Sequence, residues 1–297
     1  MLNTQTIDNS NQNTSKQQPK KQSFKYFIKR SYLGRILLIP VRIYYALSIN
    51  LPTIGKILSW GFASKEFTNY TYAITETSLA YLAQTLAIVT SASVSEIEKY
   101  LKEPEQDSDL VNHIIEKTSN SELRNIADAK CQFGRRLGWY ALVRILKPKI
   151  VVETGIDKGL GSVLLCYALM KNASEGHQGR YFGTDINPDA GYLLTAPYDQ
   201  YGEILYGDSI QSLEKFELPI DIFINDSDHS SEYEYQEYLT IKDKLTPKGV
   251  ILGDNSEVTD RLSRFSKETD RQFLFFAENP KDHWCPGSGI GISFKKN

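Results

Sequence analysis

Short apolar runs in the second half of the chain constrain its fold more than any other feature. They begin after Lys149, and polar segments with helical patterns separate most of them. Strands that alternate with helices form a mostly parallel sheet with helices on both faces. We therefore predict an α/β fold over residues 148–297, with a doubly wound, mostly parallel, seven-stranded sheet. The runs are KIVVET, RYFGTDI, EILYGD, IDIFIND, GVILGDN, RQFLFFAE and GIGISF.

Acidic residues stand at or next to the carboxyl ends of the first five runs. In a doubly wound sheet, ligands bind beyond the carboxyl ends of the strands. One acid at such a position is as often the N-cap of the following helix. Five in succession indicate a ligand site. They are Glu153, Asp185, Asp208, Asp226 and Asp254, the last followed by Asn255.

The turn after the first run, VVETGIDKGLGS, discriminates between nucleotide-binding classes. Its glycines let the backbone approach a ligand, and the helix that follows presents free N–H groups. A nicotinamide fingerprint requires GxGxxG, but counting from Gly159 places Leu164 at the third glycine. The pattern therefore argues against a nicotinamide-dependent oxidoreductase, and the sequence contains no GxxxxGK[ST] phosphate loop.

The order acid-x-Gly-x-x-x-Gly at Glu153, Gly155 and Gly159 resembles the first motif of the class I S-adenosylmethionine-dependent methyltransferases. The resemblance covers about residues 130–297. It implies a Rossmann-like methyltransferase fold in which these three residues hold the methionine end of S-adenosylmethionine.

The same resemblance assigns the rest of the cofactor to the next two strands. Asp185 would bind the ribose, because a carboxylate can accept hydrogen bonds from both hydroxyls. Asp208 and Ser209 would meet the adenine.

The runs FINDSDH and GVILGDN together are similar to a pairing found in the cation-dependent O-methyltransferases. The DSDH run is also similar to the cephalosporin hydroxylase and rhamnosyl O-methyltransferase-like families. These resemblances imply one divalent cation, held by Asp226, Asp254 and Asn255. Oxygen ligands of this kind suit Mg²⁺. The alternative is that Asp226 and Asp254 simply cap the helices that follow them.

Two residues next to the implied cation are candidates for the catalytic base. A cation bound to an acceptor hydroxyl lowers its pKa and positions the oxygen for attack on the methyl group, which leaves a proton to be accepted. We favour Asp228 as the base, with His229 second. In the alternative interpretation, His229 orients the loop at the start of a helix.

Residues 63–147 have the apolar periodicity of helices, and we interpret them as a lead-in that closes over the cofactor. Arg135, Arg136 and Trp139 would then line the pocket, although an arginine pair is more often a solvated face. His283 and Trp284 lie in the loop between the last two runs. They suit a sugar or ring, but a plain hairpin loop is the simpler interpretation.

The first 62 residues differ in composition from the rest of the chain. Residues 1–22 are almost entirely polar, so we predict a disordered tail that cannot serve as a signal peptide. Residues 23–62 mix apolar with basic residues and are predicted to form an amphipathic arm. We expect Pro40 and Pro52 to break any helix there, so the sequence predicts no transmembrane span.

Charge is distributed unevenly along the chain. Residues 1–60 hold nine Lys or Arg against Asp8 alone, whereas the whole chain has a formal charge of −2. The arm would lie on an anionic membrane, or would pack on its own domain or on the mate in a homo-oligomer. The acidic remainder argues against a nucleic-acid-binding protein.

The sequence thus predicts a cytoplasmic enzyme that methylates a hydroxyl of a small molecule or glycan, using S-adenosylmethionine and Mg²⁺. Its three widely spaced cysteines favour reduced thiols. Two alternatives stay open: a nicotinamide-dependent oxidoreductase, and a non-catalytic protein that docks on a membrane or partner through the arm.

Overall fold

The computed structural model describes residues 30–254 and 256–296. The chain divides between Gly55 and Lys56 into two units, and the second unit contains the entire sheet. The predicted tail, residues 1–22, and the start of the predicted arm lie outside the described residues. The lead-in of residues 63–147 belongs to the same unit as the sheet.

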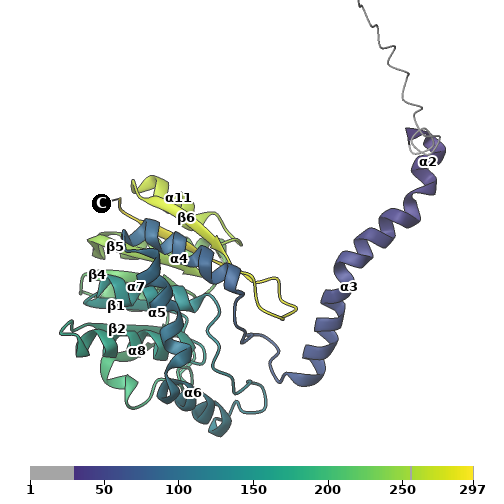
Figure 1. The fold of residues 1–297 in the computed structure, drawn as a ribbon. Coiled ribbons are helices and arrows are strands. Elements are labelled where there is room, and N and C mark those ends of the chain that lie inside the picture. The colour runs from purple at the N-terminus through teal and green to yellow at the C-terminus, as the bar shows by residue number, and fades with distance from the viewer. Residues whose placement is uncertain (1–29, 255, 297) are drawn as a thin grey trace, which may run out of the picture. The chain divides into compact units, whose positions relative to one another are not determined.

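The sheet has seven strands in the order β3, β2, β1, β4, β5, β7, β6 (Figure 1). The pairs β1–β2, β1–β4, β2–β3 and β4–β5 are parallel, whereas β7 runs antiparallel to both β5 and β6. The predicted doubly wound, mostly parallel fold is therefore confirmed. The strands are β1 Ile150–Thr154, β2 Arg180–Asp185, β3 Gly202–Tyr206, β4 Ile220–Asn225, β5 Leu245–Asp254, β6 Gln272–Ala277 and β7 Gly289–Phe294.

Helices cover both faces of the sheet because the strand side chains on both faces are apolar. Figure 1 shows helices of the lead-in and α8 layered against one face. Residues of α9, α10 and α11 form a second apolar core on the other face. The helices are α4 Glu76–Thr90, α5 Val94–Gln106, α6 Ser108–Asn120, α7 Arg136–Leu146, α8 Leu160–Ser174, α9 Ser209–Lys215, α10 Ser231–Ile241 and α11 Arg261–Glu268, with 3₁₀ turns at Tyr198–Tyr201 and Lys242–Lys244.

Side-chain caps fix where several helices begin. The Thr75 side chain accepts a hydrogen bond from the Ser78 N–H at the start of α4. The Ser93 side chain accepts from the Glu96 N–H at the start of α5. Each cap satisfies a backbone donor that the first helical turn leaves free.

The N-terminal helices correct one prediction. Helix α2 spans Tyr32–Leu37 and α3 spans Ile39–Ala63, with Pro52 inside α3. The expectation that Pro40 and Pro52 break any helix is therefore wrong. Pro40 lies in the first turn of α3, where an intrahelical N–H is not required, and Pro52 sacrifices one backbone hydrogen bond of a long helix. By length and composition alone, the stretch Tyr32–Ala63 is long and apolar enough to cross a membrane.

The central strand β5 provides a test of the core. Leu252 is fully buried, whereas Leu239 on α10 is 43% exposed. We expect Leu252→Ala to lower the free energy of unfolding by about 2–5 kcal/mol, because it leaves a cavity in a packed core. Leu239→Ala is the matched control and should change it by less than about 1 kcal/mol. Urea unfolding followed by circular dichroism measures both, and equal midpoints would contradict this placement of β5.

Candidate active site

A cavity of about 600 Å³ opens where the strands of the sheet end. Its walls come from the loop after β1 and from the carboxyl ends of β2, β3, β4 and β5. The sheet thus brings together residues that lie up to 100 positions apart in the sequence. Of the predicted site residues, the cavity is lined by Gly155, Asp185, Asp208, Ser209, Asp226, Asp228, His229 and Asp254.

The glycine turn after β1 fits against the neighbouring strand only because it lacks side chains. Gly155 has a φ of +76°, and a Cβ there would lie 2.1 Å from the carbonyl oxygen of Asp226. Gly159 has a φ of +85° and begins α8. It is not among the residues that line the cavity, so its contribution is to the turn itself.

Glu153 lies beneath this turn and lines a smaller adjoining cavity instead. It is 1% exposed and accepts hydrogen bonds from the hydroxyls of Tyr181, at 2.5 Å, and Ser162, at 3.3 Å. Burial raises the pKa of Glu153 to about 7, although these hydrogen bonds oppose the rise. The carboxyl group is therefore held by side chains of α8 and β2 and lines the small cavity.

Asp185 ties the end of β2 to the glycine turn. Its Oδ2 accepts from the backbone N–H groups of Ile156 and Asp157, both at 3.0 Å. Its Oδ1 accepts from the Asn187 N–H at 2.8 Å. A carboxylate oxygen can accept two hydrogen bonds, so Oδ1 keeps capacity for a ligand hydroxyl.

Asp208 has the capping role that the sequence left open beside cofactor binding. Its Oδ1 caps α9 by accepting from the Gln211 N–H at 2.9 Å, and its Oδ2 accepts from the Tyr233 hydroxyl at 2.9 Å. Ser209 hydrogen-bonds to the buried carboxylate of Glu237. The end of β3 is therefore held in place by side chains of α10.

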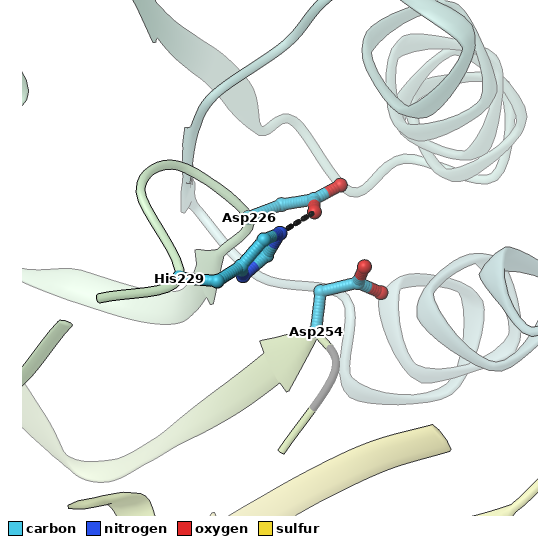
Figure 2. A group of neighbouring side chains, drawn as sticks. All are labelled: Asp226, His229 and Asp254. Carbon is cyan, nitrogen blue, oxygen red and sulfur yellow. Dashed lines mark ion pairs between the residues drawn. The ribbon is translucent and has the colours of Figure 1, made fainter. Parts of the chain in front are cut away.

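Three side chains at the ends of β4 and β5 converge on one point, as Figure 2 shows. Ligand atoms of Asp226, His229 and Asp254 all lie within 4.8 Å of one another. The His229 Nε2 is 3.8 Å from the Asp226 Oδ1. Two carboxylates and one imidazole at this separation are a set that a divalent cation can bind.

Two arginines neutralise these acids, which corrects the interpretation of the pair as a solvated face. Arg135 is 8% exposed and binds both carboxylate oxygens of Asp254, with an Nε to Oδ1 distance of 2.5 Å. The Arg136 Nη2 is 3.3 Å from the Asp226 Oδ2. Trp139 is fully buried under the Arg136 guanidinium and does not line the cavity.

The two acids respond differently to their surroundings. Burial and the nearby charge of Asp254 raise the pKa of Asp226 well above its usual range, and Arg136 offsets only part of this. Burial also disfavours the ionised form of Asp254, but the charge and hydrogen bonds of Arg135 outweigh it and lower the pKa of that carboxyl. Asp254 is therefore ionised, whereas the protonation state of Asp226 depends on the charges next to it.

The structure separates the two candidate bases. Asp228 Oδ1 accepts a hydrogen bond from the Ser230 N–H at 2.7 Å, just before α10. His229 faces Asp226, and its side chain is 39% exposed. His229 is thus the candidate that the loop directs towards the acids. Asn255, predicted as a cation ligand, lies outside the described residues.

Several residues at the cavity had no signal in the sequence. Asn69 lines it, and its Nδ2 donates to the Asp157 Oδ2 at 2.9 Å, across 88 positions. Tyr233 also lines it. The predicted loop residues His283 and Trp284 do not: they pack against Trp60 in an aromatic cluster away from the strand ends.

Comparison with known proteins finds one family model that matches part of the chain. Residues 152–256 match a model described as a methyltransferase domain. The position of the antiparallel β7 between β5 and β6 also differs from the classic dinucleotide-binding strand order. No curated protein matches the chain.

Solved methyltransferases resemble the chain at low identity. One, from Geobacter sulfurreducens, is 20% identical, covers 68% of this chain and 96% of its own, and has a TM-score of 0.47. An S-adenosylhomocysteine-bound methyltransferase from Podospora anserina is 16% identical over 68% of this chain and 95% of its own, with a TM-score of 0.47. An O-methyltransferase from Streptomyces achromogenes, solved with S-adenosylmethionine, is 14% identical over 65% and 92%, with a TM-score of 0.45. At these scores the similarities decide nothing about the activity of this chain.

Glu237 gives the site a testable pH dependence. It is fully buried among donors from Thr154, Ser209 and Ser227, yet burial raises its pKa to about 7. A carboxyl group with a raised folded-state pKa keeps its proton on folding, so it contributes stability below about pH 4.5 that is lost as the pH rises to about 7. The loss amounts to about 3 kcal/mol at most.

We therefore expect the free energy of unfolding to fall less between pH 5 and pH 8 in Glu237→Gln than in the wild type. Urea unfolding at both pH values measures it. The exposed Glu217→Gln serves as the matched control and should leave the decline unchanged. A decline of wild-type size in Glu237→Gln would show that this carboxyl group is ionised throughout.

Proposed function

We propose that the protein transfers the methyl group of S-adenosylmethionine to a hydroxyl of a small molecule or glycan, with the help of a divalent cation. The carboxylate oxygens of the site suit Mg²⁺. The observation that carries this proposal is that one cavity at the strand ends holds both the glycine turn with Asp185 and the group Asp226, His229 and Asp254. The methyltransferase domain supplies the reaction class.

The cofactor would lie along the ends of β1, β2 and β3. Gly155 lines the cavity at the turn, and Asp185 offers its Oδ1 to the ribose hydroxyls. Asp208 and Ser209 line the same wall further along, where the adenine would lie. A neutral adenine and a hydroxylated ribose are matched by hydrogen-bond acceptors that the backbone already orients.

The residues present fit a divalent cation. Carboxylate oxygens of Asp226 and Asp254 lie within 4.8 Å of each other, and His229 lies beside them. Arg135 also keeps Asp254 ionised. A cation held there would lower the pKa of an acceptor hydroxyl and fix its oxygen. Asn255 would complete the oxygen ligands.

The acceptor proton would pass to a side chain of the loop between β4 and α10. His229 is the better placed of the two predicted bases, because its imidazole faces Asp226 whereas Asp228 already accepts from a backbone N–H. Bases of this kind contribute about 10² to 10⁴ in rate. When no metal cation is bound, Arg136 would stabilise the ionised form of Asp226.

Calorimetric titration tests the cofactor. We expect S-adenosylmethionine and S-adenosylhomocysteine to bind with micromolar affinity and NADH not to bind. Asp185→Asn should weaken both sulfur nucleotides by about tenfold or more, because a hydrogen bond to a charged acceptor contributes about 1.5–3 kcal/mol. The exposed Asp189→Asn, in the same loop, is the matched control. Binding of NADH alone would overturn the proposal.

Electron paramagnetic resonance with Mn²⁺ tests the cation separately from turnover. We expect Asp226→Asn to lose Mn²⁺ binding while it keeps S-adenosylhomocysteine binding. Asp221→Asn, at the opposite end of β4, is the control and should retain both. Unchanged Mn²⁺ binding in Asp226→Asn would remove the cation from this site and leave the methyltransferase assignment intact.

Assays of S-adenosylhomocysteine release, run with a panel of hydroxylated acceptors, distinguish the two candidate bases. We expect His229→Ala to lower kcat by about a hundredfold or more and Asp228→Ala by less than tenfold. The reverse ranking would assign the base to Asp228.

A further inference from the structure

Helices α2 and α3 carry exposed large apolar side chains over a wide part of their surface, and no described residue of α3 is buried. A wide apolar helix surface belongs in a protein core or in contact with lipid. The exposed large apolar residues of the two helices are Tyr32, Leu33, Ile36, Leu37, Ile39, Val41, Ile43, Tyr44, Tyr45, Leu47, Ile49, Leu51, Ile54, Ile57, Leu58 and Phe62.

The basic residues of this stretch lie on one side. Arg35 and Arg42 are seven residues apart, about two turns, and the Arg42 Nη2 donates to the Arg35 carbonyl at 2.6 Å. Lys56 follows fourteen residues after Arg42 and so returns to the same side. Residues 30–63 contain no Asp or Glu. The helix therefore combines a purely positive side with a wide apolar one.

We propose that α2 and α3 lie in the surface of an anionic lipid bilayer and bring the methyltransferase domain to it. The basic side would face the headgroups, and the apolar side, including Leu47, Leu51 and Leu58, would enter the acyl boundary. The charge of the helix complements that of anionic lipids. A second copy of the same helix would cover only one stripe of this surface and would bring like charges together.

An in-plane position also fits the length of the uncharged segment better than a span does. Residues 43–55, between Arg42 and Lys56, carry no charge and rise by about 20 Å in a helix. The hydrocarbon core of a bilayer is about 30 Å thick. A helix lying in the interface keeps both charged side chains at the headgroups without crossing that core.

Vesicle flotation of the full-length protein tests this inference. We expect binding to phosphatidylcholine vesicles that contain phosphatidylglycerol, and much weaker binding to phosphatidylcholine alone. The double variant Leu51→Glu with Leu58→Glu should lose binding. Ile88→Glu, at a 64% exposed position on α4, is the matched control and should bind as wild type. S-adenosylhomocysteine binding in each variant shows that the domain is folded.

A second pair of variants tests the charge. Arg35→Gln with Arg42→Gln should lower affinity for the anionic vesicles by about tenfold or more, because each basic side chain near the surface contributes. Lys99→Gln with Lys102→Gln, exposed on α5, should not. Absence of vesicle binding by folded protein would overturn the inference. So would a lipid-free dimer, seen by light scattering, that the Leu51 and Leu58 substitutions dissociate.

Discussion

The buried guanidinium of Arg135 is the interaction on which the rest of the site depends. It binds Asp254 at the end of β5, the Glu278 carboxylate at 3.0 Å after β6, and the Tyr72 hydroxyl at 3.0 Å before α4. Without it, Asp254 would be a buried charge that lacks its ion-pair partner, which is costly in a low-dielectric interior. One side chain thus neutralises the acid that the sheet places at its edge and joins the lead-in to the sheet. The lead-in is therefore part of the site's construction.

The same edge of the sheet supports both halves of the proposed chemistry. Parallel strands end together, so acids that follow different strands become neighbours. Asp185 accepts hydrogen bonds from the backbone of the glycine turn, and Asp208 caps a helix with one of its oxygens. The same carboxylates thus have structural roles at the edge where the cofactor is proposed to bind. Buried Glu153 and Glu237, whose pKa values are raised to about 7, accept hydrogen bonds from neighbouring hydroxyl groups at this edge.

The sequence was sufficient to predict the strands and the acids at their ends, because apolar runs and strand-end acids are local patterns. The partners of those acids could not be predicted. Arg135 lies 119 positions before Asp254, and nothing in its neighbourhood distinguishes it from a solvated arginine. The prediction that Pro52 breaks the helix was wrong because a long helix loses only one backbone hydrogen bond at a proline and keeps the others. Likewise, the residue types at His283 and Trp284 suit a ligand contact, but Trp284 packs against Trp60 and Tyr70.

A crystal structure of the full chain with S-adenosylhomocysteine and Mn²⁺ would test the central claim most directly. The account predicts the ribose hydroxyls against Asp185 and an anomalous Mn²⁺ peak between Asp226 and Asp254 in the same cavity. A nucleoside bound away from the ends of β1 and β2 would contradict the cofactor site. A cavity that holds the nucleoside but gives no Mn²⁺ peak, with Arg136 still on Asp226, would contradict the cation.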